Sequence, residues 1–160
     1  MSLPEALRNG VESALEERLG KGVRVRSSTP VGGGCINPSA RLLTDLGESW
    51  FLKWNSSADP QMFGAEADGL EGLRRGARTS SQGIRVPEVV GWGGAGTPMD
   101  PTWLLLEFIP SGSPGPQYGA RLGEGLAYLH SSASSAFQRS GAGPYGWSRD
   151  NFIGSLPQDN

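Results

Sequence analysis

Three features of the sequence bring together residue types that bind phosphate groups. The chain has one run of three glycines, made of Gly32, Gly33 and Gly34. Lys53 lies in the middle of "SWFLKWN", and Glu66 follows in "MFGAEADGL". Glycine lets backbone N–H groups approach a phosphate closely, because no side chain stands in the way. A lysine ammonium can pair with the phosphates of ATP, and a fixed glutamate can hold that lysine in position.

Each of these features also has an ordinary structural interpretation. Glycine runs are common in loops, and a strand lysine is usually solvated. Glu66 could lie at the edge of a helix face, because helix faces are read with an error of a residue or two. Their order along the chain favours the phosphate-binding interpretation. A carboxylate on an apolar helix face needs a partner, and Lys53 would supply one.

The segments around these residues have the patterns of an antiparallel sheet. Strands are predicted in "VRVRSSTPV", "SARLL", "SWFLKWN", "VPEVVGWGG" and "PTWLLLEFI", and "TDLGE" reads as a hairpin turn with Asp45 and Gly47. Alternation along "SWFLKWN" places its tryptophans and Leu52 on one face and Lys53 on the other. The order of elements predicts an α+β fold, a five-stranded antiparallel sheet with helices on one side.

Two helices are predicted beside this sheet. "SLPE" has capping-box spacing from Ser2 to Glu5, and an apolar stripe at steps of four follows it. The second helix covers residues 59–76, with Asp59 as its N-cap. Its apolar stripe contains Glu66 and is formed by Phe63, Leu70 and Leu73.

The linker "PSGSPGPQ" predicts a boundary between residues 1–109 and residues 110–160. A third helix is predicted in "YGARLGEGLAYLHSS", with Leu122, Leu126 and Leu129 on one side. If partners for this helix are missing, those leucines form an exposed apolar patch and the chain self-associates. The tail "YGWSRDNFIGSLPQDN" is predicted to be rich in turns.

Composition excludes several classes of protein. With 14 basic and 16 acidic residues, the chain does not attract nucleic acid by bulk charge. No apolar run is long enough to cross a bilayer, and "MSLPEALRNG" has no signal-peptide core. One cysteine and one histidine form neither an internal disulfide nor a usual structural zinc site. We expect a cytoplasmic protein that binds neither nucleic acid nor membrane.

The chain resembles the fructosamine kinase (ketosamine-3-kinase) family, which belongs to the aminoglycoside and choline kinase-like branch of the protein kinase fold. The resemblance rests on "GGGCIN", "FLKWN", "MFGAEADGLEGLR", "RVPEVVGWG", "LLLEFI", "GEGLAYLH" and "DNFIGSLPQDN". It implies a kinase-like N-terminal lobe over residues 1–109 and the beginning of a helical C-terminal lobe over residues 110–160.

The resemblance also implies roles for individual residues. The three glycines would cover the ATP phosphates, and Lys53 would contact phosphates and pair with Glu66. Backbone groups of the hinge would meet adenine; the hinge residues are Glu107, Phe108 and Ile109. "LLLEFI" is equally well read as a buried strand, and both interpretations can hold. The implied reaction is ATP- and Mg²⁺-dependent phosphorylation of a sugar hydroxyl on a fructosamine or ribulosamine.

The sequence departs from the family in lacking the "HGD"-type catalytic loop and the later aspartate that holds magnesium. We therefore expect this chain to supply the nucleotide-binding part and to have little or no activity alone. Two alternatives stay open: another small-molecule kinase of the same fold, of the aminoglycoside or choline type, or a non-catalytic dimerising remnant.

Several other residues have two interpretations. Cys35 is either a small buried residue or, as the family implies, a redox-sensitive thiol that links two copies. His130 is interpreted as a structural residue at a helix end, since no "GxSxG" motif accompanies it. Four polar residues of the tail are either turn residues or substrate contacts; they are Asp150, Asn151, Gln158 and Asn160.

Overall fold

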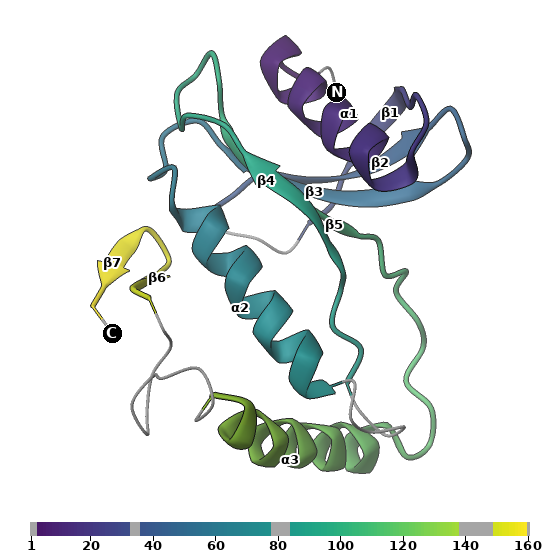
Figure 1. The fold of residues 1–160 in the computed structure, drawn as a ribbon. Coiled ribbons are helices and arrows are strands. Elements are labelled where there is room, and N and C mark those ends of the chain that lie inside the picture. Colours follow the sequence, from purple (N-terminus) through teal and green to yellow (C-terminus); the bar gives the residue numbers. More distant parts are fainter. Residues whose placement is uncertain (1–2, 33–35, 78–83, 138–148, 160) are drawn as a thin grey trace.

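The computed structural model describes residues 3–32, 36–77, 84–137 and 149–159 (Figure 1). In chain order the elements are α1 (Glu5–Leu19), β1 (Val25–Pro30), β2 (Ser39–Thr44), β3 (Ser49–Asn55), α2 (Met62–Ala77), β4 (Val89–Gly93), β5 (Thr102–Glu107), α3 (Tyr118–Phe137), β6 (Asn151–Ile153) and β7 (Leu156–Gln158). Among these residues, no helix is both long enough and apolar enough to span a membrane.

The first five strands form one antiparallel sheet in the order β1-β2-β3-β5-β4. This confirms the predicted five-stranded α+β arrangement. β3 lies at the centre, where Lys53 is opposite Ser39 of β2 and Leu104 of β5. The β2–β3 turn closes through Gly47, whose φ of 80° favours glycine.

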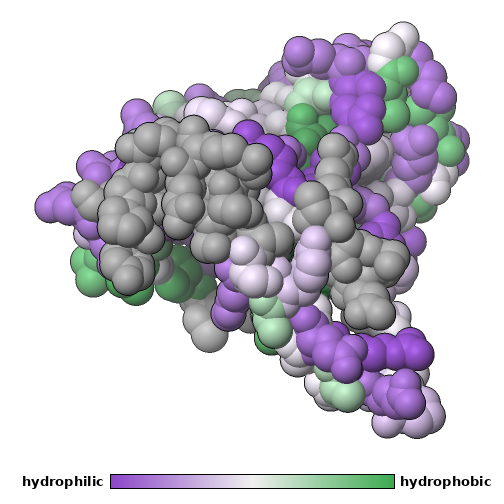
Figure 2. Space-filling view, turned by 60° about the horizontal axis from the view of Figure 1, so that its bottom comes forward, coloured by the Kyte–Doolittle hydropathy of each residue, from purple (hydrophilic) through white to green (hydrophobic). Residues whose placement is uncertain are grey.

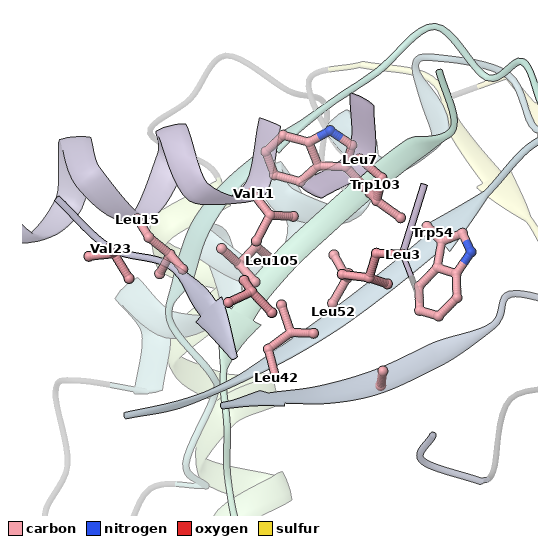
Figure 3. Packing of buried hydrophobic residues seen from close by; sticks show 12 residues of the cluster. Leu3, Leu7, Val11, Leu15, Val23, Leu42, Leu52, Trp54, Trp103 and Leu105 are labelled. Carbon is pink, nitrogen blue, oxygen red and sulfur yellow. The ribbon is translucent and has the colours of Figure 1, made fainter. Parts of the chain in front are cut away.

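One face of the sheet packs against α1, as Figure 3 shows. Leu7, Val11 and Leu15 lie at steps of four along the helix and are fully buried. They meet Leu42, Leu52 and Leu105, together with the rings of Trp54 and Trp103. Full burial of each such aliphatic side chain contributes roughly 1.5–3 kcal/mol, so this face is the main hydrophobic core of the chain.

The other face packs against α2, so the prediction that the helices share one side is wrong (Figure 1). Phe63 of α2 is fully buried against Leu104 and Leu106 of β5, whereas Leu105 points to the α1 side. β5 is therefore apolar on both faces. The continuous run "WLLL" is typical of a strand covered on both sides.

The helix ends differ from the predicted ones. α1 follows Pro4 without a side-chain cap, and Ser2 lies outside the described residues. α2 begins at Met62, three residues after Asp59, the predicted N-cap. Asp59 Oδ1 accepts the Gln61 N–H at 2.7 Å in the turn that precedes the helix. Leu73, predicted in the apolar stripe, is 37 % exposed.

The C-terminal elements pack around α2. α3 contacts α2, and Phe152 of β6 packs against the cluster that contains Phe63. The tail was predicted to be turn-rich, but Asn151–Gln158 forms a β6–β7 hairpin with Gly154 (φ 64°) at its turn. Strands of three residues are too short for alternation to predict.

The predicted leucine patch on α3 is smaller than expected. Leu129 is buried, whereas Leu122 and Leu126 are 38 % and 41 % exposed. On the coloured surface of Figure 2, hydrophobic residues occur in small groups separated by hydrophilic ones. α3 also continues to Phe137, so His130 lies exposed inside the helix rather than at its end.

Candidate functional site

The Lys53–Glu66 pair is the centre of the candidate site. Lys53 Nζ donates to Glu66 Oε1 at 2.7 Å and to Oε2 at 2.8 Å. Alternation along β3 turns Lys53 towards α2, while Leu52 and Trp54 enter the α1 core. The Lys53 ammonium also lies 5.6 Å from the centroid of the Phe63 ring, a distance at which cation–π attraction operates.

A cavity of about 590 Å³ opens beside this pair. Its polar end contains Lys53 and Glu66, and its apolar walls include Phe51, Leu70 and Leu106. The remaining lining residues come from the loop between β1 and β2 and from the first residue of β2: Val31, Gly32, Ile36, Asn37 and Ser39. Phe51 and Leu106 face each other across β3 and β5, two residues along β3 from Lys53. A flat apolar group and a charged group therefore find separate partners in this cavity, which is the chemistry of a purine nucleotide.

A second cavity, of about 450 Å³, shares Lys53 and Glu66 with the first. The two also share Ile36, Asn37 and Leu70. Its other walls come from α2 and from the C-terminal hairpin: Met62, Ala65, Gly69, Leu73, Asn151, Phe152 and Gly154. The hairpin therefore completes the surroundings of the pair, a part that the turn-rich interpretation of the tail did not predict.

Of the three predicted phosphate-binding glycines, the structure places Gly32 in the first cavity. Gly33, Gly34 and Cys35 lie outside the described residues. Their phosphate contacts, and a disulfide through Cys35, therefore stay predictions.

The predicted hinge, residues 107–109, comes directly after Leu106 in the sequence. Leu106 lines the first cavity, and the three hinge residues do not. The Glu107 N–H donates to the Glu88 carbonyl at 2.8 Å, so it is not available to a ligand. Of the two hinge residues that follow, Phe108 stacks under Arg41, with 4.8 Å from Cζ to the ring centroid, and Ile109 is 38 % exposed.

The Glu107 side chain is engaged on the side of β4. The Arg85 guanidinium donates to Glu107 and holds the pKa of this carboxyl below its ordinary value of 4.5; partial burial opposes this effect. The Glu88 N–H adds a hydrogen bond to Oε2 at 3.3 Å, which also lowers the pKa. The carboxylate therefore anchors the hinge to the segment before β4.

Magnesium ligands do not gather in the part of the chain that the structure describes. Within it, no three His, Cys, Asp or Glu side chains lie close enough to hold a metal ion. Glu66 is the acidic residue of both cavities, and both its oxygens accept from Lys53. Mg²⁺ therefore does not fit these residues, and we derive no step through it.

The tail residues separate into two groups. Asn151 lines the second cavity, whereas Gln158, its partner across the hairpin, is exposed. Asp150 is exposed, and Asn160 lies outside the described residues.

Sequence reasoning missed Asn37. This residue lines both cavities, and its Oδ1 accepts from Asn55 Nδ2 at 2.8 Å. The available signal was its place at the end of "GGGCIN", in the loop that carries the glycines.

An antiparallel five-stranded sheet with a lysine–glutamate pair between β3 and the next helix defines the N-terminal lobe of a kinase-like fold. The chain belongs to the fructosamine kinase family, which matches residues 7–160.

Relatives and solved structures support this assignment. A Synechocystis protein named as a probable ketoamine kinase is 33 % identical over 94 % of this chain, and the Arabidopsis thaliana chloroplastic protein-ribulosamine 3-kinase is 38 % identical over 88 %. A crystal structure described as a fructosamine-3-kinase, from Haemophilus somnus 129PT, matches 94 % of this chain with a TM-score of 0.71 at 26 % identity.

The match covers only part of each relative. The chain spans 45 % of the Synechocystis protein, 39 % of the Arabidopsis protein and 45 % of the Haemophilus somnus structure. It thus spans less than half the length of the relatives it matches.

Proposed function

We propose that this chain is the nucleotide-binding part of an ATP-dependent kinase that phosphorylates a sugar hydroxyl of a ketosamine, such as a fructosamine or ribulosamine. The observation that carries the proposal is the two-oxygen Lys53–Glu66 pair at the polar end of a cavity with apolar walls. The names of the relatives support the kinase class and the ketosamine substrate class.

Within the proposed site, each part of the cavity has a separate task. Phe51 and Leu106 offer apolar contact to adenine, and the hinge backbone beyond Leu106 offers hydrogen bonds. Lys53 neutralises phosphate charge, while Glu66 holds its ammonium in one place. The glycines around Gly32 would bring backbone N–H groups to the phosphates.

The proposal divides the chain into residues 1–109, which bind the nucleotide, and residues 110–160, which begin the second lobe. Transfer joins the sugar oxygen to the γ-phosphorus, releases ADP and moves the hydroxyl proton to a base. The family's catalytic aspartate loop is absent from this sequence. Mg²⁺ would be held by residues of that missing part, so we propose that this chain alone transfers no phosphate.

An ATP analogue with an acylating group on its terminal phosphate tests the placement of the phosphates. Lys53 and Lys21 are the two lysines of the chain. Lys21 is exposed in the turn after α1, the helix that covers the sheet face opposite to α2. We expect mass spectrometry to find the acyl group on Lys53, and excess ATP to block that reaction. Equal labelling of both lysines, unaffected by ATP, would contradict the proposal.

We also propose a dimer and a location for the protein. A dimer linked through Cys35 would migrate as a dimer on a non-reducing gel and disappear in the Cys35→Ser variant. A cytoplasmic location remains a prediction, and the plant relatives are named as chloroplastic.

A further inference from the structure

A chain of hydrogen bonds leads from the backbone after β3 to the wall shared by the two cavities. The Ser57 N–H donates to Asn55 Oδ1 at 2.9 Å, and the Ser57 hydroxyl lies 3.1 Å from the same oxygen. Asn55 Nδ2 then donates to Asn37 Oδ1 at 2.8 Å. The end of β3 and the turn after it are thereby linked to the loop before β2.

This series of hydrogen bonds fixes the orientation of the Asn55 and Asn37 side-chain amides. A backbone N–H can only donate, so the Asn55 group that faces Ser57 must be its oxygen. The Asn55 NH₂ therefore faces Asn37, and a donor there requires that Asn37 present its oxygen. Asn37 Nδ2 is the remaining donor of this hydrogen-bonded series, and no described residue accepts from it.

The position of Asn37 Nδ2 limits the kinds of ligand atom that can accept its hydrogen bond. Asn37 lines both cavities together with Lys53 and Glu66. In the structure the two Glu66 oxygens accept from Lys53 and not from Asn37 Nδ2. A ligand atom that meets Asn37 therefore lies at the cationic end of the first cavity, where anionic oxygens are favoured.

We propose that Asn37 Nδ2 donates a hydrogen bond to a phosphate oxygen of the bound nucleotide, with Asn55 as the residue that orients it. This inference rests on the proposed nucleotide site and adds a binding residue to it. Asn37 would act together with Lys53: the ammonium supplies charge and the amide supplies a directed donor. Adenine, at the Leu106 end, would not contact Asn37.

The sharpest variant is Asn37→Asp, which keeps the size of the side chain. A carboxylate at residue 37 can still accept from Asn55 Nδ2, so the link between this loop and the end of β3 is retained. Towards the cavity, however, it replaces the donor by a negatively charged acceptor. Calorimetry should show MgATP affinity reduced by at least about tenfold, while adenosine affinity stays within about twofold, because adenosine has no phosphate.

The outcomes separate this inference from the proposed function. If Asn37→Asp binds MgATP as well as wild type while Lys53→Met does not, the inference is overturned and the nucleotide site stands. If Asn37→Asp weakens adenosine as much as ATP, Asn37 has a structural role only, and the inference is again overturned. If wild type binds MgATP no more tightly than adenosine, or if Lys53→Met binds MgATP as tightly as wild type, the nucleotide site itself is wrong.

A second variant tests the orienting role of Asn55. In Asn55→Asp an acceptor faces Asn37, which must turn its NH₂ towards residue 55 and its oxygen towards the cavity. We expect weaker MgATP binding in the wild-type background and no further loss in the Asn37→Ala background. A loss of equal size in both backgrounds would reflect the added charge alone and would contradict the orienting role.

Discussion

Gly64 of α2 faces the ring of Trp92 on β4: a Cβ at residue 64 would lie 3.0 Å from Cη2 and 3.1 Å from Cζ3 of that ring. The absence of a side chain lets α2 lie close to the edge strand of the sheet. Glu66 is on the same helix, two residues further, so this close approach also helps to set its distance from Lys53.

A pair of substitutions in α2 tests this contact. Alanine is favoured over glycine inside a helix by about 1 kcal/mol. Gly69→Ala meets no atom within 4 Å and should gain that amount of unfolding free energy. Gly64→Ala should lose the gain, because Trp92 must move, and be at least about 1 kcal/mol less stable than Gly69→Ala. Urea unfolding measures both; equal gains would contradict close packing at Gly64.

Glu88 joins the two helices that flank the sheet. Its carboxylate lies 2.9 Å from Arg18 Nη2 of α1 and 3.4 Å from Arg74 Nη2 of α2. These groups are partly solvated, so we expect Glu88→Gln to cost about 1 kcal/mol of unfolding free energy or less. The matched control is Glu71→Gln, whose 3.9 Å pair with Arg74 lies within one helix. A control effect as large as that of Glu88→Gln would argue against a specific bridge.

The hinge carboxylate predicts a pH dependence of stability. Arg85 lowers the pKa of Glu107 in the folded chain below 4.5. A lowered folded-state pKa means that Glu107 stabilises the fold above its unfolded pKa, and that this contribution is lost as the pH falls through the folded pKa. The difference in unfolding free energy between wild type and Glu107→Gln should be below about 1 kcal/mol.

Urea unfolding at pH 6.0 and at pH values below about 4 checks this prediction. The wild-type advantage over Glu107→Gln should shrink at the acidic values. An advantage that is constant with pH, or that grows on acidification, would contradict the Arg85–Glu107 pairing.

The directions of the side chains along β3 could be predicted from the sequence, because alternation along a single strand fixes them. Leu52 and Lys53 are neighbours, and alternation alone sends the first into the core and the second towards α2. Helical spacing placed Glu66 on the apolar side of the helix after β3, where it meets Lys53.

Other features of the fold and of the site depend on tertiary contacts, which the periodicity of the sequence does not predict. α1 and α2 each have an apolar side, but neither pattern says which face of the sheet it covers. The hairpin that brings Phe152 to α2 is built from strands of three residues, too short for a pattern. The orientation of the Asn37 amide depends on its hydrogen bond to Asn55, a residue across the β2–β3 hairpin.

The central claim is that the Lys53–Glu66 pair forms a nucleotide cradle, and calorimetric titration with MgATP tests it most directly. Lys53→Met removes the ammonium from the cavity, while Lys21→Met removes the same charge from an exposed site. We predict saturable binding to wild type and to Lys21→Met, and at least about tenfold weaker binding to Lys53→Met. Binding that is equal in all three proteins, or absent from wild type, would contradict the account.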